Sequence, residues 1–145
     1  MSSPFEWLID LELLRKFPQR YARAADDRDH DALASLFDPE GTIDGTRGTQ
    51  AVPDYLEWMR NLPQSYASSM HMLADPLVDF EAGSDTAHLD AYAVVFQTGP
   101  VSGEGGDLTL GMRYRDDMVR RDGVWRIHRR VATTEWIRKG EPRHE

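Results

Sequence analysis

The sequence contains no cysteine, so disulfide bonds, thiolate nucleophiles and metal sites with cysteine ligands are excluded. It also has no apolar run that approaches the roughly 18 residues typical of a membrane-spanning helix. We therefore expect no membrane partner. The first ten residues have no basic segment ahead of their apolar ones, which predicts no secretory signal, and the expected location is the cytoplasm.

Positive charge is scarce: 17 lysines and arginines stand against 25 aspartates and glutamates, which gives a formal net charge of −8. Nucleic-acid backbones are bound mainly through lysine and arginine, so we expect no nucleic-acid partner. Repeats and linker-like segments are also lacking. The 145 residues predict a single domain, 1–145, whose core needs no disulfide or structural metal. The polar tail from about residue 138 is expected to fray.

Helical periodicity occupies the start of the chain. From Phe5 to about Ala25, apolar residues recur every three or four positions, which predicts one buried helix face. That face would carry Leu8, Leu11, Leu14, Phe17 and Tyr21. Pro18 lacks a backbone N–H, so a kink or a split into two helices is expected there. Asp29 is expected to cap a second, short helix.

Turn residues separate these helices from a third one. The segment Asp38–Gly41 has the composition of a turn, and Thr42–Gly45 after it is predicted to form an edge strand. A helix is expected over Val52–Met59, because apolar and aromatic residues follow Pro53 at helical spacing.

The second half of the chain is β-like. The expected strands are residues 69–81, interrupted by Pro76, then 86–97, 108–119 and 124–136. The pair Asp122-Gly123 is typical of a tight hairpin turn. Helices followed by a run of strands predict an α+β fold, in which the N-terminal helices pack on a strongly curved antiparallel or mixed sheet.

A helix held against a bent sheet leaves a concave space, which is the default position for a ligand. Asp26 ends the apolar face of the first helix, whereas Asp27 and Asp31 are interpreted as surface residues. On an ideal helix Asp26 lies about 140° from Tyr21. The two side chains therefore converge only if the helix tightens or ends between them.

His71 has apolar neighbours, and strand alternation places it on one face with Ser69 and Leu73. A carboxylate on one ring nitrogen would fix its tautomer and raise its basicity. A satisfied core histidine is the alternative. On the last strand, regular alternation would group Arg129 with Ile127 and Val131, whereas a bulge would turn Arg130 inward. Both readings stay open.

No metal-binding motif is present, and Gly103–Gly106 lacks the Lys-Ser/Thr of a phosphate-binding loop. We therefore expect no metal. His88 is interpreted as a surface residue. The aromatic residues Trp58, Tyr114, Trp125 and Trp136 are interpreted as core rather than as a cofactor site. The side chains expected to line the pocket are Trp58, Met59, Met72, Tyr92 and Met112.

Several of these segments form one recognisable pattern. They are Tyr21 with Asp26 five positions later, Leu33–Phe37, Gly41–Asp44, His71, and Arg120–Ile127. Together they resemble the SnoaL-like branch of the nuclear-transport-factor-2-like superfamily over nearly the whole chain. The resemblance implies a cone-shaped α+β fold, a pocket at its wide end, no cofactor, a hydrophobic small-molecule substrate and a homodimer joined through the outer sheet face.

Within that family, the chain is similar to scytalone dehydratase, bile-acid 7α-dehydratase and lindane dehydrochlorinase. These enzymes use an Asp near the end of the first helix and a His on the first long strand as an acid/base dyad. The resemblance thus implies that Asp26 and His71 form the dyad, that Tyr21 donates a hydrogen bond and that Arg130 completes the site. The chain departs from scytalone dehydratase at one position: it has Ala25 where that enzyme has a second tyrosine beside its Asp.

The implied activity is that of a cofactor-independent lyase or isomerase, dehydratase-like, acting on a hydrophobic cyclic molecule of polyketide or steroid type. The sequence does not distinguish dehydration from isomerisation or another elimination. Two alternatives remain at this stage. One is a non-catalytic ligand-binding or subunit-like module, similar to the β subunit of ring-hydroxylating dioxygenases, and the other is a dimeric protein in which the dyad is only a core hydrogen bond.

Overall fold

The computed structural model describes residues 3–141 and has the predicted α+β organisation. The helices are α1 (Pro4–Arg15), α2 (Phe17–Asp26), α3 (His30–Ser35) and α4 (Val52–Asn61). The strands are β1 (Phe37–Gly45), β2 (Gly48–Ala51), β3 (Tyr66–Leu73), β4 (Leu77–Asp79), β5 (Thr86–Pro100), β6 (Leu108–Arg121) and β7 (Val124–Lys139). Among the described helices, none is long and apolar enough to cross a bilayer.

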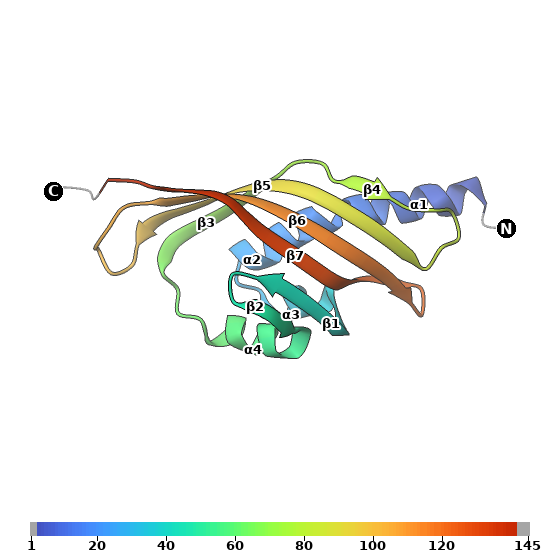
Figure 1. The fold of residues 1–145 in the computed structure, drawn as a ribbon, viewed down its shortest axis with the longest axis horizontal. Helices are drawn as coiled ribbons and strands as arrows, with labels where there is room; N and C mark the ends of the chain where they lie inside the picture. The colour runs from blue at the N-terminus through green and yellow to red at the C-terminus, as the bar shows by residue number, and fades with distance from the viewer. Residues whose placement is uncertain (1–2, 142–145) are drawn as a thin grey trace.

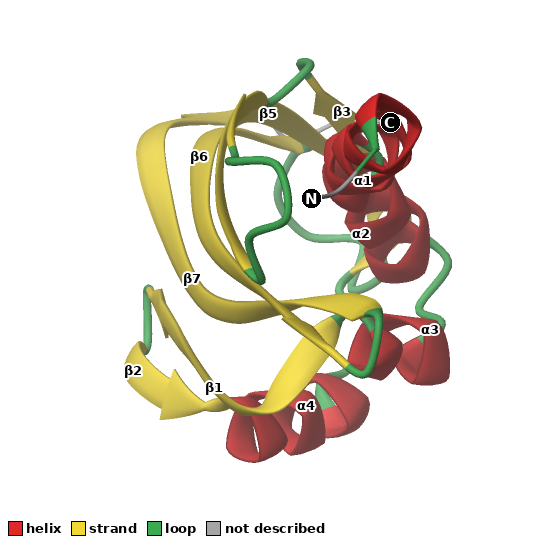
Figure 2. Cartoon of the chain, turned by 90° about the vertical axis from the view of Figure 1, so that its right-hand side faces the viewer, coloured by secondary structure: helices red, strands yellow, loops and turns green. Residues whose placement is uncertain are grey.

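One mixed sheet contains all seven strands, in the order β2-β1-β7-β6-β5-β3, with β4 paired to β5. The β1–β7 pair is parallel, and the other pairs are antiparallel. The sheet curves strongly, and helices lie along its open side (Figure 2). Figure 1 shows α1 and α2 in line behind the long strands, while α4 lies beside β1 and β2. This curvature creates the concave inner face that the sequence predicts.

The first helical segment is split, as expected. α1 ends at Arg15 and α2 begins at Phe17, so Pro18 occupies the first turn of α2, where its missing N–H is not needed. Tyr21 is buried, but Leu8 is 52% exposed. The prediction that Leu8 lies on the buried face is wrong, because Asp10 faces the sheet and Leu8 lies about 200° from it around the helix.

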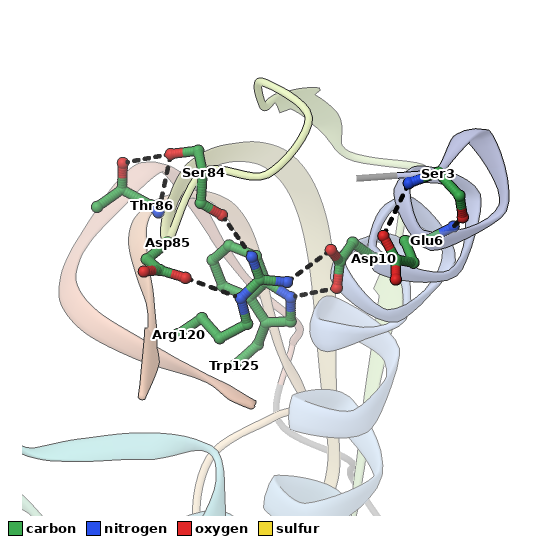
Figure 3. Close-up of polar contacts among 8 residues, drawn as sticks. All are labelled: Ser3, Glu6, Asp10, Ser84, Asp85, Thr86, Arg120 and Trp125. Atoms are coloured by element: carbon green, nitrogen blue, oxygen red, sulfur yellow. Dashed lines mark hydrogen bonds and ion pairs between the residues drawn. The ribbon is translucent and has the colours of Figure 1, made fainter. Parts of the chain in front are cut away.

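The polar anchor of α1 consists of Asp10, Arg120 and Trp125 (Figure 3). Arg120 Nη1 donates to Asp10 Oδ2 at 2.6 Å, and Trp125 Nε1 donates to Asp10 Oδ1 at 3.0 Å. Arg120 Nε also donates to Asp85 Oδ1 at 3.0 Å, in the loop before β5. One carboxylate of α1 thus joins the helix to both strands of the β6–β7 hairpin.

The position of β1 differs from the prediction. The expected turn at Asp38–Gly41 lies inside β1, and β1 is not an edge strand, because it lies between β2 and β7. Its register against β7 shifts between Phe37 and Thr42. Gly41 is required at this irregularity, because a Cβ there would overlap the His128 carbonyl. The local turn composition therefore marks a bulge within a strand rather than a chain reversal.

The β6–β7 hairpin turn has the predicted position. Asp122 and Gly123 have φ angles of 51° and 76°, and two successive positive values are the mark of a type I′ turn. Further along, the register shifts between Asp117 and Met118, which leaves an extra residue on β7. Beyond this bulge Arg130 pairs with Asp116, and both side chains are buried. Arg130, and not Arg129, is therefore the inward arginine.

The expected fraying of the tail lies partly outside the described residues. Strand β7 continues through Lys139 and includes Arg138. Residues 142–145 are among those that the structure does not describe.

The substitution Asp10→Ala is predicted to destabilise the protein by about 2 kcal/mol, because it removes two hydrogen bonds from partly buried donors, one of them charged. Glu12→Ala on the same helix is the control, since Glu12 is exposed and only pairs with Lys16. Its effect should stay within about 0.5 kcal/mol. Urea unfolding of the three proteins measures this, and equal losses for the two variants would contradict the role given to the anchor.

Candidate active site

A cavity of about 450 Å³ opens between the inner face of the sheet, the end of α2 and α4. This volume suits a small organic molecule. Its deep wall is formed by buried residues of α2, β6 and β7, among them Tyr21, Tyr114 and Arg130. Its mouth is formed by the exposed β1–β2 turn and by residues 62–67, which comprise the connection from α4 and the first two residues of β3.

Asp26 and His71 meet on the wall of this cavity. His71 Nδ1 lies 2.6 Å from Asp26 Oδ1, and the His71 backbone N–H donates to Asp26 Oδ2 at 2.8 Å. Ser69 Oγ donates to Asp26 Oδ1 at 3.3 Å. The side chains of His71 and Asp26 are only 11% and 18% exposed. The predicted pair is thus brought together by the end of α2 and the second half of β3.

This geometry assigns the tautomer of His71. An ionised carboxylate can only accept hydrogen bonds, so the neutral imidazole carries its hydrogen on Nδ1. No described residue donates to or accepts from Nε2 of His71. The ring therefore presents a basic nitrogen at the cavity, held in orientation by the two contacts of Asp26.

Tyr21 lies beside His71, although α2 runs without a break from Tyr21 through Asp26 and does not end between them. The rings of Tyr21 and His71 meet edge to face, with centroids 5.7 Å apart. Burial raises the pKa of both Tyr55 and Tyr114, and hydrogen bonding with Tyr21 raises it further. These phenols therefore stay neutral at physiological pH and remain able to donate hydrogen bonds.

Arg130 lies below the tyrosines. Its Nε and Nη2 donate to the two carboxylate oxygens of Asp116, each at 2.8 Å. The guanidinium carbon is 4.0 Å from the ring centroid of Tyr21 and 4.6 Å from that of Tyr114. Burial alone would lower the pKa of Arg130, but the charge and hydrogen bonds of Asp116 raise it above its ordinary value. Arg130 is a buried, permanent cation.

The third guanidinium nitrogen of Arg130 has no partner among the described residues. Nη1 is buried and makes no hydrogen bond, although Arg130 is one of the residues that line the cavity. Leaving a charged donor unsatisfied is costly. Nη1 is thus a buried cationic donor that no described group satisfies, on a residue of the cavity wall.

The other predicted lining residues divide between the two faces of the sheet. Trp58, Met59 and Met112 line the cavity. Met72 and Tyr92 do not, since they are 57% and 59% exposed and lie together in a shallow groove on the outer face. Their prediction was wrong because Met72 alternates with His71, and Tyr92 with the buried Ala91 and Ala93, along their strands. Homodimer formation through this outer face stays a prediction.

The sequence interpretation missed three polar residues of the site: Tyr55 and Tyr114 line the cavity, and Asp116 binds Arg130. Tyr114 was interpreted as a plain core aromatic, and neither Tyr55 nor Asp116 was singled out. A usable signal exists on β6, where Met112, Tyr114, Asp116 and Met118 alternate on one face. A carboxylate within an otherwise apolar face requires a buried cation as its partner.

Apart from His71, no histidine within residues 3–141 lines the cavity. His88 pairs with Asp117 at 2.9 Å, and its side chain is 45% exposed, which agrees with its interpretation as a surface residue. His128 pairs with the buried Asp38 at 2.9 Å. Across residues 3–141, no group of three or more histidine, aspartate or glutamate side chains is arranged to hold a metal ion.

Comparison with known proteins identifies the fold. A family model described as a SnoaL-like domain matches residues 8–131. A hexachlorocyclohexane dehydrochlorinase, LinA type 2, superposes with a TM-score of 0.84 at 17% identity, covering 99% of this chain and 97% of that chain. A protein from Novosphingobium aromaticivorans DSM 12444, provisionally named a scytalone dehydratase, gives a TM-score of 0.77 at 19% identity, covering 99% and 100%.

A third solved structure carries the name of the wider superfamily. It is a nuclear-transport-factor-2-like protein from Salmonella enterica serovar Typhimurium, with a TM-score of 0.73 at 15% identity, covering 85% of this chain and 89% of that chain. At such identities the likeness shows the fold alone, and it confirms the predicted cone of helices on a curved mixed sheet. No curated protein matches the sequence significantly.

The buried pair of Arg130 and Asp116 gives a prediction for stability. Asp116→Ala should destabilise the protein by about 3–5 kcal/mol, because it leaves a buried guanidinium without its counter-charge. Combining it with Arg130→Met should restore a large part of the loss. Asp90→Ala is the control: Asp90 binds Arg113 in the same bidentate way, at 2.9 and 2.6 Å, but at a partly exposed site.

The control should cost about 1 kcal/mol or less. Thermal and urea unfolding of the single and double variants measure these differences. Equal losses for Asp116→Ala and Asp90→Ala would show that burial does not set the strength of the Arg130 pair.

Proposed function

This chain belongs to the SnoaL-like domain family, and from that premise we propose that it is a cofactor-independent lyase or isomerase. Its substrate in this proposal is a hydrophobic, cyclic small molecule of polyketide or steroid type. The observation that carries the proposal is the 2.6 Å contact of His71 Nδ1 with Asp26, which leaves Nε2 as a base on the wall of the cavity. Structural neighbours named for dehydrochlorination and dehydration support an elimination.

In the proposed first step, His71 Nε2 removes a proton from a carbon next to a carbonyl or a leaving group. Asp26 holds the ring in place and stabilises the imidazolium that forms. In an elimination, the electron pair of the broken C–H bond forms the new double bond while the leaving group departs with its own pair. In an isomerisation, the pair moves onto the carbonyl oxygen as an enolate.

The proton then leaves His71 in a second step. It passes to the departing hydroxyl in a dehydration, or to a different carbon of the enolate in an isomerisation. One histidine thus acts first as base and then as acid. No group beyond those of the chain and the substrate is needed for the balance of protons and electrons.

Negative charge that develops on oxygen is proposed to be stabilised from the deep wall. Arg130 Nη1 is a donor without a partner among the described residues, on a permanent cation, and Tyr21 lies beside it in one cluster with Tyr114. Donors that are fixed in place before the reaction stabilise such charge strongly. Asp116 holds the other two nitrogens of Arg130, so the guanidinium is fixed in place before a substrate binds.

We do not favour the subunit-like alternative. A non-catalytic module has no need for a basic ring nitrogen at an open cavity, or for a buried guanidinium nitrogen without a partner. The core-hydrogen-bond alternative likewise does not account for a cavity of about 450 Å³ next to the pair.

The substitutions His71→Gln and Asp26→Asn are each predicted to lower turnover by about 10²–10⁴-fold while the protein still folds, because each removes the general base or its orientation. The assay follows formation of a conjugated enone from a panel of cyclic β-hydroxyketones by ultraviolet absorbance. His88→Gln is the matched control, since His88 makes the same kind of contact with Asp117 on the outer face.

The control variant should keep full activity. Full activity in His71→Gln or Asp26→Asn, with the unfolding midpoint unchanged, would refute the dyad mechanism.

A further inference from the structure

Four charged side chains line the cavity: Asp26, Arg28, Arg47 and Arg130. Arg130 is balanced by Asp116, whereas Asp26 binds the neutral ring of His71 and keeps its one negative charge on the cavity wall. Arg28 and Arg47 have no carboxylate within ion-pairing distance in the described part of the chain. In a chain with a formal net charge of −8, the cavity mouth therefore carries uncompensated positive charge.

Arg47 is held at the mouth by an aromatic ring. It lies in the exposed β1–β2 turn, and its guanidinium carbon is 4.7 Å from the ring centroid of Trp58 on α4. Such stacking fixes the plane of the guanidinium and leaves the N–H groups at its edge available. Those N–H groups are the part of arginine that binds an oxyanion in a bidentate way.

Arg28, which follows the end of α2, reaches the same end of α4. Its Nη2 donates to the carbonyl oxygen of Leu62 at 2.6 Å, and Leu62 follows Trp58 by one helical turn at the end of α4. Both arginines thus lie against the last turn of α4, where Trp58 and Leu62 themselves line the cavity.

The backbone at Arg28 gives a second, independent observation. Arg28 N–H donates to Ala25 O at 3.2 Å and Asp29 N–H to Ala24 O at 2.9 Å, which is the Schellman pattern after α2. Arg28 occupies the left-handed position of this motif, with φ of 52°, where glycine is normally preferred. From this position the Arg28 side chain extends to the end of α4, where its Nη2 donates to Leu62 O.

From this arrangement we infer that the substrate carries an anionic oxygen group, received by Arg47 and Arg28 at the mouth, on the end remote from the carbon that faces His71. The inference rests on the proposed function and narrows its substrate class to amphipathic acids. The apolar ring system would lie against Trp58, Met59 and Met112, between the charged mouth and the dyad. The mouth would select and orient the molecule, and the dyad would act on its inner end.

The experiment compares two probes with the same ring skeleton, 8-anilinonaphthalene-1-sulfonate and N-phenyl-1-naphthylamine, which differ by one sulfonate. Fluorescence titration of the folded protein should show the anionic probe binding about tenfold more tightly than the neutral one. The difference in affinity between the two probes should decrease as salt is added, because the mouth is exposed and its charge is screened. Displacement of the anionic probe by 1-naphthoate or by 1-naphthyl phosphate then distinguishes a carboxylate from a phosphate as the preferred group.

Charge-removing variants locate the effect. Arg47→Gln and Arg28→Gln should each weaken binding of the anionic probe about fivefold, the effect of one ion pair at an exposed site, and leave the neutral probe unchanged. Arg20→Gln and Arg23→Gln are the matched controls, because both are exposed arginines of α2 that lie in a separate surface groove. These two should leave both probes unchanged.

Equal affinity for the two probes would overturn the inference, and so would equal weakening by the control variants. Either result would leave the dyad mechanism standing, because binding of these probes does not depend on turnover. Conversely, charge discrimination at the mouth combined with full activity of His71→Gln would retain the anion site and refute the proposed reaction.

Discussion

The contact between Asp26 and His71 is the interaction on which the site depends. It joins the end of α2 to β3 through two oxygens of one carboxylate, which accept from the ring and from the backbone of His71. A carboxylate at the C-terminal end of a helix is unfavourable by about 0.3–1 kcal/mol, because the helix dipole is negative there. Its position therefore contradicts local helix preference, and such violations concentrate at functional sites.

A second polar pair determines the shape of the deep wall. Arg130 lies inward only because the register of β6 against β7 shifts by one residue near Asp117. The bulge re-aims the strand, so that the guanidinium meets Asp116 and lies across the ring of Tyr21. The two pairs thus have different effects: one fixes the orientation of the His71 ring, and the other holds a cation whose third nitrogen has no hydrogen-bond partner among the described residues.

The features that were predicted correctly from the sequence are those that depend on neighbouring residues or on the family pattern. Pro18 broke the first helix, Asp29 capped the third helix, Asp122-Gly123 turned the last hairpin, and the family pattern paired Asp26 with His71. The prediction failed for features that depend on pairing between strands that are distant in the sequence. β1 became an interior strand because it pairs in parallel with β7, which lies some 80 residues later in the chain.

The direction of side chains in the cavity was the least predictable part, because it depends on strand register. Met72 was expected inside and lies outside, one alternation away from His71. Tyr55 and Asp116 were missed because their partners, Tyr21 and Arg130, come from other elements. The inward direction of the Arg130 side chain depends on a bulge that no local sequence signal in β7 predicts.

The claim that His71 Nε2 is the free base is tested most directly by ¹⁵N NMR of the imidazole ring. The geometry predicts that the neutral ring carries its hydrogen on Nδ1, with Nε2 showing the shift of an unprotonated nitrogen, and that Asp26→Asn disturbs this preference. A hydrogen on Nε2 in the neutral ring would contradict the account, because the nitrogen that faces the cavity would then be unable to accept a proton.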